Sequence, residues 1–158
     1  SDTKAKIGSF ARGQVKGRVL DICTGLGYTA IELSKRSGVE HVTTLELDPA
    51  VIEVCKRNPW SSELFSEKIT IKTGNAASIV NAFESEEFNT ICHDPPAQAL
   101  SFAGELYSLA FYENLHRILK KGGSLYHYVG NPESKESGSL FSGIMKRLTE
   151  AGFKNVRK

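Results

Sequence analysis

The stretch that decides the fold is GRVLDICTGLGYT, residues 17–29. Residues 18–22 have the apolar character of a short buried strand, with the acid Asp21 near its end. A loop that contains Gly25 and Gly27 follows the strand, and a helix is predicted directly after the loop. A strand, a tight glycine loop and a helix start together form the front half of a nucleotide-type site in an α/β sheet.

The two glycines and the helix start give this loop the means to bind a ligand. Gly25 and Gly27 can adopt backbone angles that other residues resist, and they let a ligand approach the main chain closely. The helix is predicted to begin near Tyr28 and Thr29, where its first N–H groups have no partner within the helix. A glycine-rich turn without a ligand has the same pattern, so both interpretations stay open on this stretch alone.

The composition is that of one ordinary globular domain. A chain of 158 residues can bury a substantial core, and 40% of its residues are apolar and 24% are charged. The net charge of +2 does not point to nucleic acid as a partner. The sequence has no apolar run long enough to cross a membrane and no signal peptide, so we expect a cytoplasmic protein.

The cysteines and histidines form no metal-binding or disulfide pattern. The cysteines have no CxxC spacing and are interpreted as reduced thiols, and the scattered histidines predict no metal site. These residues are Cys23, Cys55, Cys92, His41, His93, His116 and His127.

The ends of the chain suggest a piece of a longer protein. The chain starts at Ser1 and its only methionine is Met145, so we expect a natural start to be missing. Residues 1–16 are interpreted as a polar entry segment with a short helix at about residues 9–15. Residues 17–158 are predicted to form the core domain.

Strands and helices are predicted to alternate along this core. Apolar periodicity and turn residues predict strands at 18–22, 41–48, 68–72, 88–93, 124–129 and 153–158. They predict helices at 29–36, from Pro49 to about 58, around 79–83, at 102–119 and at 139–151, with a loop at 60–67. This alternation predicts an α/β fold with a doubly wound, mostly parallel sheet and helices on both faces.

Ligands of such sheets bind beyond the carboxyl ends of the strands. Glu46 ends the second predicted strand, about 20 residues after the glycine loop, where a carboxylate can accept both hydroxyls of a ribose. A solvated surface acid or a helix cap is the alternative, although Asp48 already serves as the predicted cap. Because Asp21 would repel a pyrophosphate and a third glycine is missing, the expected ligand is an adenosine that carries a positive charge and no phosphate.

The motifs taken in order resemble those of class I S-adenosylmethionine-dependent methyltransferases. The run DICTGLG, residues 21–27, resembles the first motif, usually D/E-x-G-x-G-x-G, and LELD, residues 45–48, resembles the second. GNA, residues 74–76, resembles the third motif, and HDPP, residues 93–96, resembles the fourth. The resemblance implies a Rossmann-like methyltransferase fold with S-adenosylmethionine as cofactor and an acceptor that the sequence does not identify.

The resemblance also implies roles for individual residues. Asp21 and the loop would hold the methionine part of the cofactor, Glu46 its ribose, and Leu47 would pack on the adenine. Asn75 would face the amino edge of the adenine, where the family more often has Asp. The implied cofactor-binding residues are Asp21, Cys23, Thr24, Gly25, Gly27, Tyr28, Thr29, Glu46, Leu47, Asn75 and Ala76.

Asp94 is the first candidate for a catalytic residue that orients or deprotonates an amine, and His93 is the second. The alternative for Asp94 is that it only starts a turn before the prolines, and a histidine at a strand end, such as His93, is more often packed or hydrogen-bonded than a base. Two departures from the family pattern stand out. Cys23 replaces the first glycine, and Ala97 stands where amino-methylating enzymes have an aromatic residue, so no base methylation is predicted.

A second resemblance leads to the spermidine synthase branch of the same superfamily. Residues 45–58 and 93–132 are similar to that branch, whose members transfer an aminopropyl group from decarboxylated S-adenosylmethionine. That family has G-G-G-D/E-G in its first loop, whereas this loop is C-T-G-L-G, and the overall likeness is to archaeal predicted methyltransferases. A methyltransferase is therefore the leading interpretation, and an aminopropyltransferase or a non-catalytic adenosyl-binding module is the alternative.

The family sheet usually ends with a seventh, antiparallel strand, and this sequence stops before it. An open sheet edge is a liability because its unpaired backbone groups can bind another strand. We therefore expect either a longer protein or a homodimer that forms through the incomplete edge.

Overall fold

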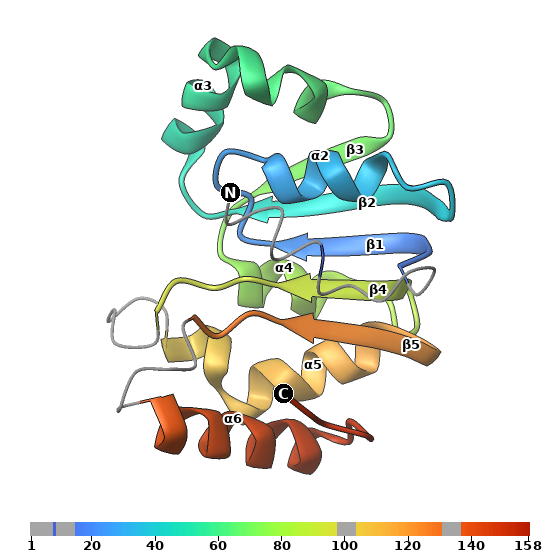
Figure 1. Cartoon of the computed structure of the whole chain (residues 1–158), viewed down its shortest axis with the longest axis vertical. Helices are drawn as coiled ribbons and strands as arrows, with labels where there is room; N and C mark the ends of the chain where they lie inside the picture. Colours follow the sequence, from blue (N-terminus) through green and yellow to red (C-terminus); the bar gives the residue numbers. More distant parts are fainter. Residues whose placement is uncertain (1–7, 9–14, 98–103, 131–136) are drawn as a thin grey trace.

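The computed structural model describes residues 8, 15–97, 104–130 and 137–158 (Figure 1). Five parallel strands form one open sheet in the order β3-β2-β1-β4-β5. The strands are β1 (Gly17–Ile22), β2 (Val39–Glu46), β3 (Ile69–Thr73), β4 (Phe88–His93) and β5 (Leu119–His127). The predicted α/β fold is confirmed.

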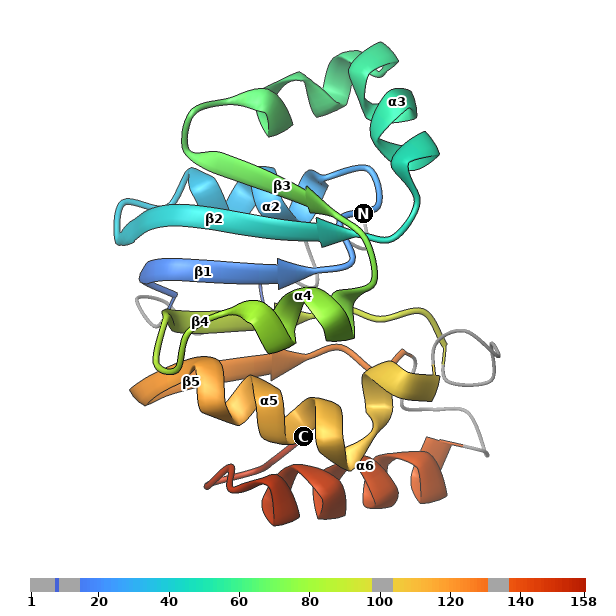
Figure 2. The same ribbon diagram turned by 180° about the vertical axis from the view of Figure 1, so that it is seen from behind.

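Helices cover both faces of the sheet. One face carries α2, and α4 and α5 lie on the other, as the two opposite views show (Figures 1 and 2). The elements between the strands are α2 (Tyr28–Ser34), α3 (Pro49–Arg57), the 3₁₀ helix η1 (Pro59–Phe65), α4 (Ala76–Ala82), the 3₁₀ helix η2 (Gly104–Tyr107), α5 (Leu109–Ile118) and α6 (Ser137–Ala151). The sheet is therefore doubly wound, as predicted.

Strand β1 lies at the centre of the sheet and its side chains are buried on both faces. Leu20 and Ile22 belong to the core cluster beneath α4, α5 and α6. Val19 belongs to the cluster on the other face, with residues of α2, α3 and η1. Burial on both faces explains why residues 18–22 show a nearly continuous apolar run with little alternation.

The predicted long helix at 102–119 is interrupted in the structure. Residues 98–103 lie outside the described part of the chain, η2 forms a single turn, and α5 begins anew after Ser108. The Ser108 hydroxyl accepts a hydrogen bond from the Phe111 amide at 3.1 Å and so acts as an N-cap. The apolar spacing of this segment continues through the break, and for that reason periodicity alone did not reveal it.

The predicted loop at 60–67 is also wrong, because Pro59 begins the 3₁₀ helix η1. The Asn58 side chain accepts a hydrogen bond from the Trp60 amide at 3.3 Å and starts this turn. Proline at the first helical position favours such a start because its fixed φ suits a helix. The predicted helix at 9–15 falls almost entirely outside the described residues, and Val15 is buried in the core without helical structure.

The predicted sixth strand at 153–158 is wrong, because these residues form no strand. The chain turns back at the end of α6, where Gly152 has a φ of +110° and the Phe153 amide donates to the Leu148 carbonyl at 3.1 Å. The Phe153 ring then packs against His116 of α5, with ring centroids 5.2 Å apart. The apolar residues that suggested a strand are thus used for packing on helices.

None of the helices in the described residues is both long and apolar enough to cross a membrane.

Gly27 offers a test of how the loop is packed. Its φ is +80°, and a β-carbon there would lie 2.7 Å from a methyl carbon of the fully buried Leu64. Gly25 has a φ of +52°, but a β-carbon there meets no atom within 4 Å. We expect Gly27→Ala to lower the free energy of unfolding by about 1–3 kcal/mol more than Gly25→Ala, because only Gly27→Ala overpacks the core. If urea denaturation shows the same loss in the free energy of unfolding for both variants, this packing of Gly27 against Leu64 is contradicted.

Candidate functional site

The carboxyl ends of the five strands meet at one edge of the sheet (Figure 1). Strand β1 pairs with β2 on one side and with β4 on the other. The chain winds outward from β1 to β3 and then returns to β4, so the strand order reverses between β1 and β4. Ligands of open α/β sheets bind beyond the strand ends at this kind of switch point.

The loop after β1 is fastened to the end of β2. The amides of Cys23 and Thr24 both donate to the Leu45 carbonyl, at 3.0 and 2.9 Å. Cys23 has a φ of +77°, a left-handed conformation that costs a non-glycine residue roughly 1–2 kcal/mol. The family pattern has glycine at this position. Cys23 therefore keeps a backbone conformation that suits glycine, and its side chain adds a thiol to the loop.

A buried chain of hydroxyls joins this loop to the acid of β1. The Thr44 hydroxyl donates to Oδ2 of Asp21 at 2.7 Å, and the Thr24 hydroxyl lies 2.7 Å from that of Thr44. Because Thr44 has a single hydroxyl proton and gives it to Asp21, Thr24 must be the donor to Thr44. Asp21 is only 1% exposed, so in this structure it acts on the loop through Thr44. A direct contact between Asp21 and a ligand's amino group remains a prediction.

Glu46 at the end of β2 bridges two loops through its carboxylate. Its Oε2 accepts from the Gly25 amide at 3.0 Å, and its Oε1 accepts from the Asp48 amide at 3.1 Å. The Asp48 side chain caps α3 by accepting from the Ala50 amide at 2.8 Å, as predicted. The cap role therefore belongs to Asp48, and Glu46 faces the glycine loop.

Residues of α3 and η1 support the glycine loop from behind, and sequence reasoning missed them. The Ser61 hydroxyl donates to the Leu26 carbonyl at 2.7 Å, and the Cys55 thiol donates to the Gly25 carbonyl at 3.3 Å. The Asn58 amide group donates to the Tyr28 hydroxyl at 2.9 Å. These bonds span about 30 positions in the sequence, so no local pattern indicated them.

The remaining predicted cofactor-binding residues lie at the same edge of the sheet. Leu47 is 56% exposed directly after Glu46, a large apolar side chain that is open to a ligand. Asn75 caps α4 by accepting from the Ser78 amide at 2.9 Å, and its Nδ2 donates to Glu105 at 3.4 Å. Thr29 in α2 and Ala76 in α4 are half-buried at the first turns of their helices.

The thiol of Cys23 has a strongly raised pKa. Burial is the main cause that raises this pKa to about 12, and the negative charges of Asp21, Glu46 and Asp94 act in the same direction. The thiol is therefore protonated at neutral pH. Asp94, after β4, lies beside the end of β1, because its amide donates to the Ile22 carbonyl at 3.3 Å.

The strand-end segments carry acids and no basic side chain. Among the described residues 21–28, 46–48, 73–76, 93–97 and 104–107 there is no lysine or arginine. The acids in these segments are Asp21, Glu46, Asp48, Asp94 and Glu105. The side chains of these segments therefore favour a cationic ligand over an anionic one.

His93, the second predicted catalytic residue, lies beneath the site and is 1% exposed. Its Nε2 donates to the Leu106 carbonyl at 2.8 Å, and burial holds its pKa well below the ordinary value. Its ring lies 4.5 Å from that of His127, the register neighbour on β5. The structure therefore favours the packed histidine over an exposed base.

His127 and Tyr112 complete this buried polar cluster, and sequence reasoning assigned them no role. The Tyr112 hydroxyl donates to Nε2 of His127 at 2.8 Å, and Nδ1 of His127 donates to the Tyr128 carbonyl at 3.1 Å. Burial lowers the pKa of His127 to about 4, so the ring is neutral at neutral pH. The strand order, which places β5 beside β4, was needed to find this pair.

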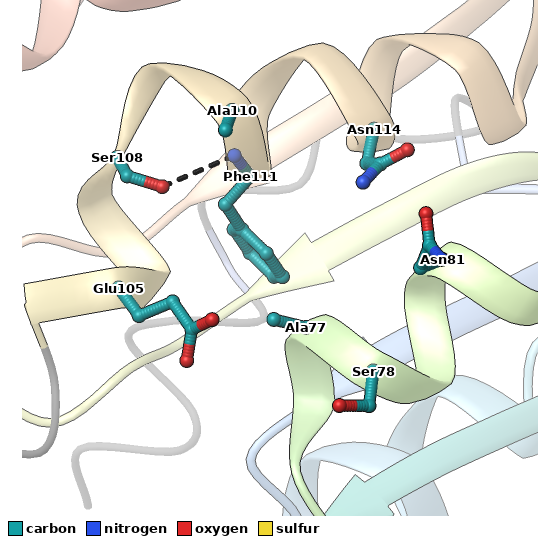
Figure 3. A pocket seen from close by; sticks show the side chains of 8 residues that line it. All are labelled: Ala77, Ser78, Asn81, Glu105, Ser108, Ala110, Phe111 and Asn114. Carbon is teal, nitrogen blue, oxygen red and sulfur yellow. Dashed lines mark hydrogen bonds between the residues drawn. The ribbon is translucent and has the colours of Figure 1, made fainter.

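A groove of about 300 Å³ lies between α4 and α5, away from the predicted residues (Figure 3). Its lining is mostly small or polar: Ala77, Ser78, Asn81, Glu105, Ser108, Ala110, Phe111 and Asn114. It borders the strand-end site at Ser78 and Glu105, which both bond to Asn75. In the described part of the chain, no group of three or more His, Cys, Asp or Glu side chains could hold a metal ion.

The fold and the strand-end site define a Rossmann-like domain of the methyltransferase type. A family model described as the spermine/spermidine synthase domain matches residues 6–157. The match covers nearly the whole chain, and the chain therefore belongs to the spermine/spermidine synthase domain family.

Two curated proteins are similar in sequence over most of this chain. The uncharacterized protein MJ1233 of Methanocaldococcus jannaschii is 50% identical over 142 residues, which are 89% of this chain and 48% of that protein. A polyamine aminopropyltransferase of Pseudomonas syringae pv. tomato is 33% identical over 132 residues, 82% of this chain and 45% of that enzyme. The chain thus spans about half the length of these relatives.

Among solved structures, a spermidine synthase in complex with the transition state analogue AdoDATO has the same fold. The TM-score is 0.82 at 23% identity, and the match covers 94% of this chain and 52% of that one. At this identity the match supports the fold and not the activity.

The buried histidines predict that acid destabilises the domain. The folded pKa of His127, about 4, lies below the usual value of 6.5, so folding favours the neutral ring. The stabilisation is complete above pH 6.5 and is lost as the pH falls from 6.5 towards 4. Between pH 6.5 and pH 4, we expect the free energy of unfolding, measured by urea denaturation, to fall by roughly 1–3 kcal/mol more in the wild type than in His127→Asn.

His41, half-exposed on β2, provides the control for this experiment. His41→Gln should keep the pH dependence of the wild type. If His127→Asn keeps the same pH dependence as well, the buried neutral histidine does not contribute to the acid sensitivity.

Proposed function

We propose that this domain binds an adenosyl sulfonium donor at the carboxyl ends of β1, β2 and β4 and transfers an alkyl group from it to an amine. The observation that carries the proposal is that Asp21, Glu46 and Asp94 are each bonded at the strand ends next to the glycine loop: Thr44 links Asp21 to Thr24, Glu46 accepts from the Gly25 amide, and the Asp94 amide donates to the Ile22 carbonyl. Membership of the spermine/spermidine synthase domain family supports the same reaction class.

The geometry of Glu46 suits a ribose. Each carboxylate oxygen accepts one backbone N–H, from Gly25 or from Asp48, and retains a lone pair that can accept a ribose hydroxyl. The exposed Leu47 side chain beside it offers an apolar surface for the adenine. Asn75 lies at the start of α4, where it can face the amino edge of that base.

The charges of the site favour decarboxylated S-adenosylmethionine over S-adenosylmethionine. The decarboxylated donor carries a sulfonium and an ammonium group and has no carboxylate. The described strand-end segments hold acids and no lysine or arginine, so their side chains complement two positive charges and supply no cationic group for a carboxylate. Aminopropyl transfer is therefore the proposed reaction, and this choice departs from the methyl transfer that the first motif suggested.

In this reaction the donor supplies a carbon that is activated by the adjacent sulfonium. The lone pair of a neutral acceptor amine forms the new N–C bond, and the electrons of the C–S bond pass to sulfur, which leaves as a neutral thioether. Asp94 orients the amine through its carboxylate and accepts the proton that nitrogen releases, before passing it to water. The loop and Glu46 hold the nucleoside in line with the attack.

Methyl transfer from S-adenosylmethionine is the second candidate. The first loop, C-T-G-L-G, lacks the G-G-G-D/E-G pattern of the spermidine synthase branch and keeps the acid-to-glycine spacing of the methyltransferase motif. The two donors share the adenosyl part, so the same residues serve both candidates. The donor's carboxylate is what distinguishes them.

Calorimetric titration separates these candidates. We expect decarboxylated S-adenosylmethionine to bind more tightly than S-adenosylmethionine and S-adenosylhomocysteine, and NAD not to bind, because the acids repel its pyrophosphate. Preference for S-adenosylmethionine would support the methyltransferase. Binding of an adenosyl ligand without turnover on any amine would indicate a non-catalytic binding module.

Glu46→Gln should weaken binding of the preferred donor by about 1–3 kcal/mol, because one oxygen that accepts a ribose hydroxyl becomes an amide donor. Asp48→Asn is the matched control, since it removes a neighbouring charge and preserves the helix cap. Calorimetry with 5′-methylthioadenosine, which is uncharged, measures the effect of each variant on nucleoside binding without the positive charges of the donor. Equal effects of both variants would mean that Glu46 acts only through its charge.

A further inference from the structure

The short helix η2 connects the separate parts of the proposed site. Its last three residues bond to two of the strand-end segments, 73–76 and 93–97. Glu105 accepts from Asn75 at 3.4 Å, the Leu106 carbonyl accepts from His93 at 2.8 Å, and the Tyr107 hydroxyl donates to the Pro96 carbonyl at 2.8 Å. Figure 2 shows η2 as the turn that precedes α5, beside the end of β4.

Two prolines limit the backbone hydrogen bonds that the segment after Asp94 can donate. Pro95 and Pro96 have no N–H group, so neither can donate to a neighbouring strand. The Asp94 amide donates to the Ile22 carbonyl over 3.3 Å, which is long for such a bond. The bond from the Tyr107 hydroxyl to the Pro96 carbonyl restrains this segment after β4 has ended.

Tyr107 is itself held firmly in the fold. It is 3% exposed, and its ring lies 5.5 Å from that of His127. Its carbonyl accepts from Nε of Arg147 in α6 at 2.8 Å. Burial raises the pKa of Tyr107 to about 12, so at neutral pH its hydroxyl keeps the proton that it donates.

We propose that Tyr107 is a positioning residue that holds the Asp94 carboxylate in its working place through the Pro96 carbonyl. The inference rests on the proposed function for its catalytic consequence. Its structural part, the restraint of the Asp94–Pro96 segment by one hydroxyl, can be measured without a donor.

Tyr112 provides a matched control for this hydroxyl. It is a fully buried tyrosine of the same cluster, and its hydroxyl donates to His127 at 2.8 Å instead of to the Asp94–Pro96 segment. Tyr107→Phe and Tyr112→Phe each remove one oxygen and keep the ring. A loss of activity that comes only from a weakened core should therefore appear in both variants.

Activity with decarboxylated S-adenosylmethionine and a diamine is the first readout. We expect Tyr107→Phe to lower kcat by about tenfold to 100-fold, since a misplaced catalytic group slows the reaction, and to leave the donor's Kd unchanged. Tyr112→Phe should keep kcat near that of the wild type. In an Asp94→Asn background, Tyr107→Phe should cause no further loss, because its effect passes through that carboxylate.

Hydrogen exchange of the Asp94 amide is the second readout, and it needs no donor. Tyr107→Phe should speed this exchange, and Tyr112→Phe should leave it as in the wild type. Unchanged exchange in Tyr107→Phe overturns the inference whatever the activity. Faster exchange in an inactive protein supports the restraint and shows that the proposed function has failed separately.

Discussion

The buried carboxylate of Asp21 is the constraint on which the site depends. It lies in the central strand with 1% exposure, where an ionised group is costly unless hydrogen bonds compensate. Thr44 of the neighbouring strand supplies such a bond, and Thr44 in turn receives one from Thr24 in the glycine loop. One acid thereby couples β1, β2 and the loop. This coupling helps to hold Cys23 in a left-handed conformation that it would not adopt alone.

A second coupling runs across the strand ends. Glu46 ties the loop after β1 to the loop after β2, and η2 ties the segments after β3 and β4 to each other. The described strand-end segments joined in this way carry acids and no lysine or arginine. Under the proposed function, the positive charge of a sulfonium donor would be attracted by these acids, and the charge of the ligand would then contribute to its selection.

The sequence revealed those parts of the fold that local patterns determine. The bounds of β4 and the Asp48 cap of α3 were predicted correctly, since apolar runs and cap residues act over a few positions. The break at Ser108 and the failed sixth strand were not foreseeable from periodicity, because packing on α5 and α6 decided them. In the site, Asp94 and Glu46 could be chosen by their place after a strand. The pairing of His93 with His127 and the bond from Tyr107 to Pro96 required the strand order and the path of η2.

A crystal structure of the protein with 5′-methylthioadenosine, the nucleoside product expected from aminopropyl transfer, tests the central claim most directly. The account predicts that both ribose hydroxyls contact the Glu46 carboxylate, that the adenine lies between Leu47 and Asn75, and that the thioether sulfur faces Asp94. A nucleoside bound elsewhere, for example in the groove between α4 and α5, would contradict the claim that the strand-end acids form the donor site.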